Sequence, residues 1–187
     1  MKKIKKGEPT YLEHKKRLEV LKTLLLFGIS AAVFLIGYLT TDTKNNLLTI
    51  VAVLGCLPAS KSAVSMIMNL KIRGISAKDA KQICAKYGDT FGFYNFYFTS
   101  YQKNYEIHHL VVGTKSIIAY SRDPKTEASA FENHLKTILK QSGISGFKVK
   151  LYTDLSKYIE RVDQLVLKEE EKTGEDTVIS TLFSVSL

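Results

Sequence analysis

The chain has 187 residues, of which 45% are hydrophobic, and its formal net charge is +9. This length accommodates one medium-sized domain, or a small domain with an appendage. Its two cysteines, Cys56 and Cys84, exclude a disulfide framework and a zinc site with the usual cysteine spacing. Two thiols at apolar positions fit a reducing compartment.

Residues 1–22 form a basic segment, which we expect to lie in the cytoplasm. It holds eight Lys or Arg residues against three Glu residues, a net charge of +5. A basic excess is typical of proteins that bind nucleic acids or membranes. Because this excess adjoins a hydrophobic run, it indicates a membrane.

The first hydrophobic run extends from Thr23 to Leu39, and its 17 residues carry no charge. As a helix it would span roughly 25 Å, close to the thickness of a bilayer's hydrocarbon core. A signal peptide would have a shorter apolar region followed by small residues at a cleavage site. The residues that follow Leu39 are Thr-Thr-Asp-Thr-Lys, which favours a membrane-spanning helix.

The second run extends from Leu47 to Leu70 and contains Pro58 and Lys61. Pro58 is expected to kink this helix rather than end it. A lysine at the centre of a membrane helix costs about 2.5–3.5 kcal/mol. Lys61 lies past the midpoint of the run, so its side chain is expected to extend towards the basic flank at Lys71.

Basic residues flank the outer ends of both runs, whereas the intervening loop holds only Asp42 and Lys44. The positive-inside rule therefore predicts a hairpin over residues 23–70 in the plasma membrane, with both termini in the cytoplasm. The alternative is that both runs are core helices of a soluble protein. The lipid bilayer is the first predicted partner.

Gly55 to Ser62 nearly matches the phosphate-binding pattern GxxxxGK[ST]. That loop needs a glycine before the lysine, where this chain has Ser60, and Pro58 removes a backbone donor. We therefore predict no nucleotide site and no cofactor. Ser60 and Ser62 belong instead to a small-residue surface that, with Lys61, is a candidate contact for another helix.

Residues 75–187 are predicted to form a cytoplasmic domain of α+β class, with a mixed sheet and the order α-β-β-β-α-β-α-β. The expected helices begin at Ser76, at Ala128 and at Leu155, and they end near Gly88, Gln141 and Lys172. The expected strands cover Phe91–Thr99, Tyr105–Val112, Ser116–Ser121, Phe147–Tyr152 and, at one edge, Thr177–Val185.

The hairpin from Tyr105 to Asp123 resembles the central hairpin of the nuclease-related (NERD) domains, which have a restriction-endonuclease-like fold. Ile107, His109 and the strand that begins at Ser116 match that family's hydrophobic pattern. The similarity covers roughly residues 76–167. With its lysine-rich start and two-helix hairpin, the chain is also similar to uncharacterised membrane proteins of low-GC Gram-positive bacteria.

The resemblance implies a divalent metal held by acidic residues, and a lysine beside it. In this chain His108 stands at the family's aspartate position, Ser121 at its glutamate and Asp123 at its lysine. A hard cation needs several oxygen ligands. Glu106, His108 and Asp123 are the remaining candidates for an unorthodox site. The simpler interpretation is that His108 and His109 are ordinary strand residues, one facing in and one facing out.

Three hypotheses for the function follow. The first is a non-catalytic membrane-anchored scaffold that binds protein partners or another copy of the chain. The second is a nucleic-acid-binding protein or divergent nuclease, for which Lys103, Arg122 and four tyrosines (Tyr94, Tyr97, Tyr101 and Tyr105) are candidate contacts. The third is a channel-like oligomer in which Lys61 lines a polar path.

Overall fold

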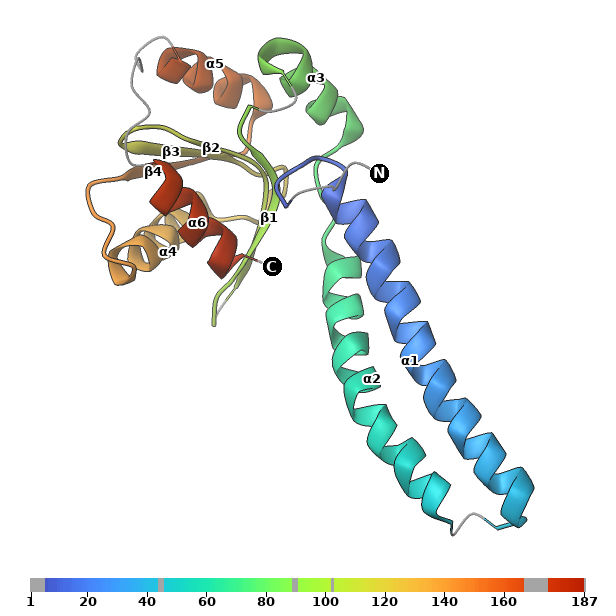
Figure 1. Ribbon diagram of the computed structural model, residues 1–187. Helices are drawn as coiled ribbons and strands as arrows, with labels where there is room; N and C mark the ends of the chain where they lie inside the picture. Colours follow the sequence, from blue (N-terminus) through green and yellow to red (C-terminus); the bar gives the residue numbers. More distant parts are fainter. Residues whose placement is uncertain (1–5, 44–45, 89–90, 102, 167–174, 187) are drawn as a thin grey trace. The chain divides into compact units, whose positions relative to one another are not determined.

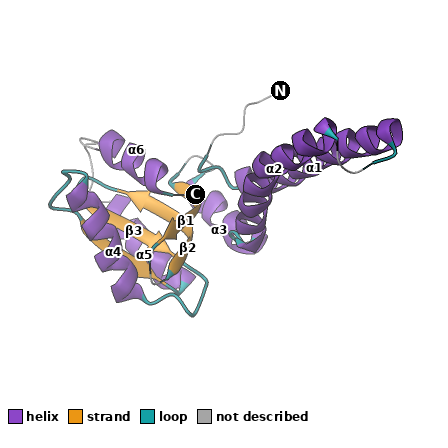
Figure 2. Cartoon of the chain, turned by 90° about the horizontal axis from the view of Figure 1, so that it is seen from below, coloured by secondary structure: helices purple, strands orange, loops and turns teal. Residues whose placement is uncertain are grey.

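The computed structural model describes residues 6–43, 46–88, 91–101, 103–166 and 175–186 (Figures 1 and 2). Two units make up the chain. One is formed by residues 12–73, and the other combines the chain up to Tyr11 with everything from Gly74 onwards. The chain therefore leaves the second unit at Tyr11 and returns to it at Gly74.

The unit of residues 12–73 is a pair of antiparallel helices, α1 (Tyr11–Thr41) and α2 (Leu47–Lys71) (Figure 1). Three of the four buried positions of α1 recur every seven residues, at Thr23, Ser30 and Gly37. A seven-residue repeat keeps one face of a helix turned towards its partner. Because these residues are small, the two backbones can approach each other closely.

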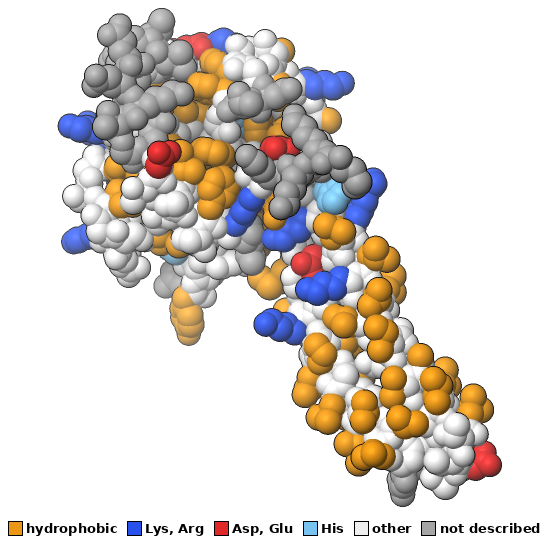
Figure 3. Space-filling view, in the orientation of Figure 1, with side chains coloured by type: hydrophobic (Ala, Val, Ile, Leu, Met, Phe, Trp, Pro, Cys, Tyr) orange, Lys and Arg blue, Asp and Glu red, His pale blue; other side chains and the backbone are white. Residues whose placement is uncertain are grey.

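Large apolar side chains cover the outside of this helix pair (Figure 3). Among the described residues, every exposed large hydrophobic side chain except Tyr101 lies between Leu18 and Leu70. Both helices are long and apolar enough to cross a membrane. The alternative that they form the buried core of a soluble protein does not fit this exposure. As predicted, α2 continues through Pro58.

The second unit has the predicted α+β class, with a four-stranded mixed sheet in the order β1-β2-β3-β4. The strands are β1 (Phe93–Thr99), β2 (Asn104–Val112), β3 (Ser116–Tyr120) and β4 (Lys148–Tyr152). Only the pairing of β3 with β4 is parallel. The helices are α3 (Ala77–Tyr87), α4 (Ala128–Gln141), α5 (Leu155–Val166) and α6 (Glu175–Val185).

Helices cover both faces of the sheet (Figure 1). On one face α4 and α6 pack their apolar side chains, among them Phe131 and Leu182, against the sheet. On the other face α3 and α5 contribute Ile83, Tyr158 and Val162 to a second core. Each of these five side chains is almost completely buried.

The predicted edge strand Thr177–Val185 is wrong, because this segment forms helix α6. Val178 and Leu182 are both buried and stand four residues apart, which is the spacing of one helix face. A strand would have turned alternate residues to the core instead. The predicted end of the preceding helix near Lys172 lies outside the described residues.

The segment before α1 docks on the second unit. The Gly7 carbonyl accepts a hydrogen bond of 2.8 Å from the Tyr94 backbone N–H, beside the start of β1. Lys6 Nζ donates to the carbonyls of Phe183 (2.8 Å) and Ser186 (2.7 Å) at the end of α6. A cation there satisfies carbonyls that have no partner within the helix.

Candidate functional site

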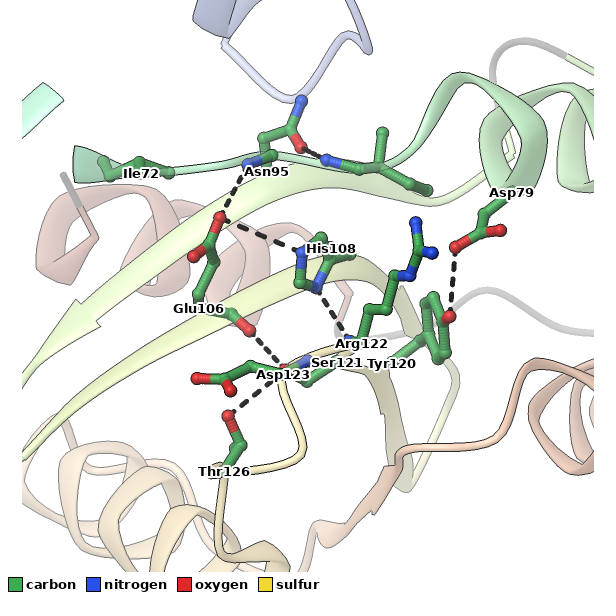
Figure 4. A network of polar contacts seen from close by, with 12 residues as sticks. Ile72, Asp79, Asn95, Glu106, His108, Tyr120, Ser121, Arg122, Asp123 and Thr126 are labelled. Atoms are coloured by element: carbon green, nitrogen blue, oxygen red, sulfur yellow. Dashed lines mark hydrogen bonds and ion pairs between the residues drawn. The ribbon is translucent and has the colours of Figure 1, made fainter. Parts of the chain in front are cut away.

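A polar cluster lies where β1 and β2 run side by side, and three side chains define it: Asn95, Glu106 and His108 (Figure 4). We call it the junction cluster. Asn95 stands opposite His108, between the pairs Tyr94–His109 and Phe96–Ile107. Its backbone φ is +59°, in the left-handed region that few residues other than glycine adopt.

Neighbouring residues of an ordinary strand face opposite sides of the sheet, and we expect this of His108 and His109. The structure contradicts that prediction. His108 and His109 are both buried, with exposed fractions of 4% and 0%. Ile107 and Leu110 belong to the same core although they are three residues apart. The alternation of β2 therefore shifts by one residue at the histidines, opposite the irregular Asn95.

Glu106 binds the chain where it returns from α2. Its Oε1 accepts a hydrogen bond of 2.6 Å from the backbone N–H of Gly74. The same oxygen lies 3.8 Å from His108 Nε2. The Glu106 side chain is only 14% exposed, so one of its oxygens is committed to these two internal contacts.

His108 is held as a neutral imidazole. Its Nδ1 accepts a hydrogen bond of 3.0 Å from the backbone N–H of Arg122, which places the ring proton on Nε2, facing Glu106. Burial lowers the His108 pKa, and this effect exceeds the opposing attraction of the Glu106 carboxylate. Both ring nitrogens thus point at groups of the protein.

Asp123 lies near His108, but its hydrogen bonds are made within its own turn. Its Oδ1 accepts from the backbone N–H of Lys125 at 3.0 Å. Ser121 Oγ donates to the Glu106 carbonyl at 2.7 Å and lies 3.3 Å from Thr126 Oγ1. The structure thus brings Glu106 and His108 together without drawing Asp123 into contact with them. Within the described ranges, no group of three or more His, Cys, Asp or Glu residues could hold a metal ion.

Asn95 is the functional candidate that sequence reasoning missed. Its Oδ1 accepts a hydrogen bond of 2.7 Å from the backbone N–H of Ile75, and its Nδ2 donates one of 3.1 Å to the carbonyl of Pro9. Pro9 comes just before α1, and Ile75 comes just after α2. One side chain therefore holds both chain segments that connect the two units. No local pattern around Asn95 signals these contacts.

His109 has a different environment from His108. Its Nε2 lies 2.9 Å from the Phe91 carbonyl, and its Nδ1 lies 2.5 Å from the Tyr158 hydroxyl. Nε2 therefore donates to the carbonyl, and Nδ1 accepts from the hydroxyl. Burial lowers the His109 pKa to about 4, so this ring is also neutral at pH 7.

The four candidate tyrosines do not form one stacking surface. Tyr94 and Tyr105 are buried, with exposed fractions of 2% and 5%. Tyr97 is partly buried. Tyr101, between β1 and β2, is fully exposed.

A basic groove lies beside the edge strand β4 and helix α5, with a volume of about 560 Å³. Four cationic side chains line it against the single carboxylate of Glu160: Lys148, Lys150, Lys157 and Arg161. Lys150 also lies 3.5 Å from Glu132 of α4. Among the described residues, this groove gathers four cationic side chains beside one carboxylate, which suits an anionic ligand.

The three candidate residues on α2 have separate environments. Ser62 is buried, and its Oγ is 2.9 Å from Thr23 Oγ1 of α1. Ser60 Oγ donates to the Cys56 carbonyl of its own helix at 2.7 Å. Lys61 is exposed on the outer surface of the pair, away from the contact between α1 and α2.

Comparisons of the chain with protein families, with curated proteins and with solved structures find no match.

Proposed function

We propose that the chain is a membrane-anchored, non-catalytic module that acts through protein partners. The observation that supports this proposal is that the candidate catalytic side chains make their contacts within the protein. Glu106 is bound to the Gly74 N–H, and His108 lies between the Arg122 N–H and Glu106. A hard divalent cation needs several oxygen ligands that are free to turn towards it. The junction cluster instead holds the backbone of Gly74 and Ile75.

The anchor in this proposal is the helix pair. Its exposed apolar side chains need a nonaqueous environment, and its length suits a bilayer. Lys and Arg residues flank the outer ends of both helices, which favours a cytoplasmic location for both termini and for the α+β unit. The plasma membrane is the proposed location.

The junction cluster gives this module a restrained attachment. Pro9 is held by Asn95 two residues before α1 begins. Gly74 and Ile75 are held by Glu106 and Asn95 within four residues of the end of α2. Both chain segments that lead to the helix pair are thus held by side chains of the α+β unit.

Tyr101 is the best-supported position for partner contact. It is the one exposed large hydrophobic side chain that the structure describes outside α1 and α2. Exposed tyrosines are common anchors of protein interfaces, because the ring is large and its hydroxyl tolerates water.

The test is photo-crosslinking in intact membranes, with benzoylphenylalanine in place of Tyr101. We expect a discrete adduct, either with another protein or with a second copy of the chain. Lys136, exposed on α4, is the matched control and should give none. Absence of adducts from Tyr101 and from a further set of surface positions would contradict the proposal.

A membrane-tethered nucleic-acid-binding protein, or a divergent restriction-endonuclease-like nuclease, is the second candidate. The basic groove between β4 and α5 favours it. It predicts that the detergent-solubilised full chain binds labelled oligonucleotides with an affinity that falls steeply with salt. Lys157→Gln with Arg161→Gln should weaken that binding. Cleavage with Mg²⁺ or Mn²⁺ that is lost in Glu106→Gln would overturn the non-catalytic assignment.

A further inference from the structure

The pairing of α1 with α2 fixes the level of Lys61 along the helix pair. Three contacts fix the register of the helix pair: Thr23 with Ser62, Ser30 with Gly55, and Gly37 with Leu48. The Thr23 and Ser62 oxygens are 2.9 Å apart. A Cβ on Gly55 would lie 2.8 Å from Ser30 Oγ, and a Cβ on Gly37 would lie 2.7 Å from the Leu48 Cβ.

In this register, each step of seven residues along α1 corresponds to seven residues back along α2. Lys61 is therefore level with Leu24, at the start of the uncharged stretch of α1, and Lys22 is level with Ala63. Beyond Ser62, α2 runs beside the charged turns of α1 that contain Arg17 and Glu19. Burying that part of α2 in hydrocarbon would bury those charges as well, at a cost of several kcal/mol. The charges of these turns therefore favour a hydrocarbon boundary near Lys22 and Lys61, with the exposed side chains of Val64, Ile67 and Leu70 beyond it in the headgroup layer.

The two lysines also point to the same side of the pair. Each directly precedes a residue of the helix contact, Thr23 or Ser62. Successive residues of a helix are 100° apart. In an antiparallel pair of helices, take two residues that face each other across the contact. The residues directly before them in the sequence then lie on the same side of the pair. Lys22 and Lys61 are both exposed. Neither has an ion pair with any residue that the structure describes.

We propose that Lys22 and Lys61 together bind the phosphate of an anionic phospholipid at the cytoplasmic boundary of the bilayer. Two ammonium groups on one side of a helix pair repel each other, most strongly beside a low-dielectric medium. A phosphodiester between them removes this repulsion. A zwitterionic lipid is a poorer ligand, because its own cation competes with the lysines. This inference rests on the membrane anchoring proposed above.

The occupant is a lipid rather than a second copy of the chain, because of charge. The adjoining turns of α1 are themselves basic, with Lys15, Lys16 and Arg17 in succession. Two such surfaces would repel each other, whereas anionic headgroups attract them.

The chain contains no tryptophan, so a single one can report on the lipids beside the site. Leu57 stands one helical turn before Lys61 on the same face of α2, and it is 68% exposed. The full-length Leu57→Trp protein is placed in vesicles in which either the anionic or the zwitterionic lipid carries brominated acyl chains. The quenching of the introduced tryptophan then gives the relative affinity of the two lipids at this position.

We expect the anionic lipid to be preferred several-fold in the Leu57→Trp protein, and the preference to vanish when Lys22→Gln and Lys61→Gln are added. Lys136→Gln with Lys140→Gln on α4 should leave it unchanged. Leu47→Trp, at the other end of α2, should show no preference. Equal quenching by both lipids in the Leu57→Trp protein would overturn the lysine site and leave the anchor intact. No quenching by either lipid would overturn the anchor itself. Loss of the preference on adding inorganic phosphate would reveal a general anion site and overturn the lipid assignment.

Discussion

At the scale of single residues, Asn95 is the most constrained side chain of the junction cluster. A left-handed backbone at a residue other than glycine costs of order 1 kcal/mol or more, although asparagine tolerates it better than most residues. Its two hydrogen bonds, to Pro9 and to Ile75, offset this cost. The conformation and the contacts therefore depend on one another.

We expect two substitutions of Asn95 to separate these effects. Asn95→Gly keeps the backbone conformation and loses both hydrogen bonds, so it should destabilise the folded chain by about 1–2 kcal/mol. Asn95→Ala also adds backbone strain, for a total of about 2–3 kcal/mol. Chemical denaturation of the solubilised full chain measures both. An alanine variant as stable as the wild type would show that the Asn95 contacts contribute nothing.

The His109 pKa of about 4 predicts a loss of stability in acid. The unfolded ring titrates near pH 6.5, so below that pH the unfolded chain binds a proton that the folded chain does not. Stability should be complete above pH 6.5, and it should fall by up to about 3 kcal/mol as the pH falls to 4. The lowered His108 pKa acts in the same direction.

The check is the dependence of denaturation midpoints on pH, which should be shallower in His109→Gln than in the wild type. His14→Gln, on the exposed surface of α1, is the control and should retain the full slope. NMR titration of the His109 ring gives an independent reading. A ring that titrates near pH 6.5 in the folded chain would contradict this prediction.

Sequence reasoning selected Glu106 and His108 through a family resemblance, and the structure brings them within 3.8 Å of each other. It could not select Asn95, because the residues that Asn95 binds, Pro9 and Ile75, are distant in the sequence and lie outside the predicted strands. It also assigned His108 and His109 to opposite faces. A shift in strand alternation depends on the neighbouring strand, which local periodicity does not reveal.

At the scale of elements, the close packing of α1 against α2 gives a direct prediction. With Cys56 and Cys84 replaced by alanine, Thr23→Cys with Ser62→Cys should form a disulfide readily, because the two side-chain oxygens are 2.9 Å apart. Gly55→Leu should suppress it, since a side chain there would collide with Ser30. The measurement is the mobility shift after mild oxidation.

The matched control for this crosslink is Thr23→Cys with Val64→Cys, since Val64 is exposed. Equal crosslinking of both cysteine pairs would contradict the register, and with it the level assigned to Lys61.

The same scale shows what patterns capture. Helix α4 was predicted with its observed bounds, Ala128–Gln141, because its apolar residues have a clear helical spacing. Helix α6 was predicted as a strand, although Val178, Ile179, Leu182 and Phe183 follow helical spacing too. This run is short, apolar and rich in β-branched residues. Its composition therefore favours a strand, although the spacing of its apolar residues favours a helix.

At the scale of the whole molecule, we expect the junction cluster to restrain the connection after α2. Trypsin cleaves after Lys71 and Arg73; Arg73 directly precedes Gly74, whose N–H is bound by Glu106. We expect Glu106→Ala to speed this cleavage several-fold in the membrane-embedded chain, because the backbone there opens more often.

Glu106→Gln retains an oxygen that can accept the Gly74 N–H, so it serves as the control and should be cleaved at close to the wild-type rate. Cleavage rates are read from the appearance of the released domain on a gel. Equal rates in the wild type and Glu106→Ala would show that this hydrogen bond does not restrain the connection.

The position of Lys6 has a consequence for synthesis. Its ammonium group binds the carbonyls of Phe183 and Ser186, so this lysine gains its partners only after roughly 180 further residues have been made. At about 5–20 residues per second, that interval is on the order of ten to forty seconds. The two apolar helices emerge within it, so they are available for insertion before the domain that brackets them can close.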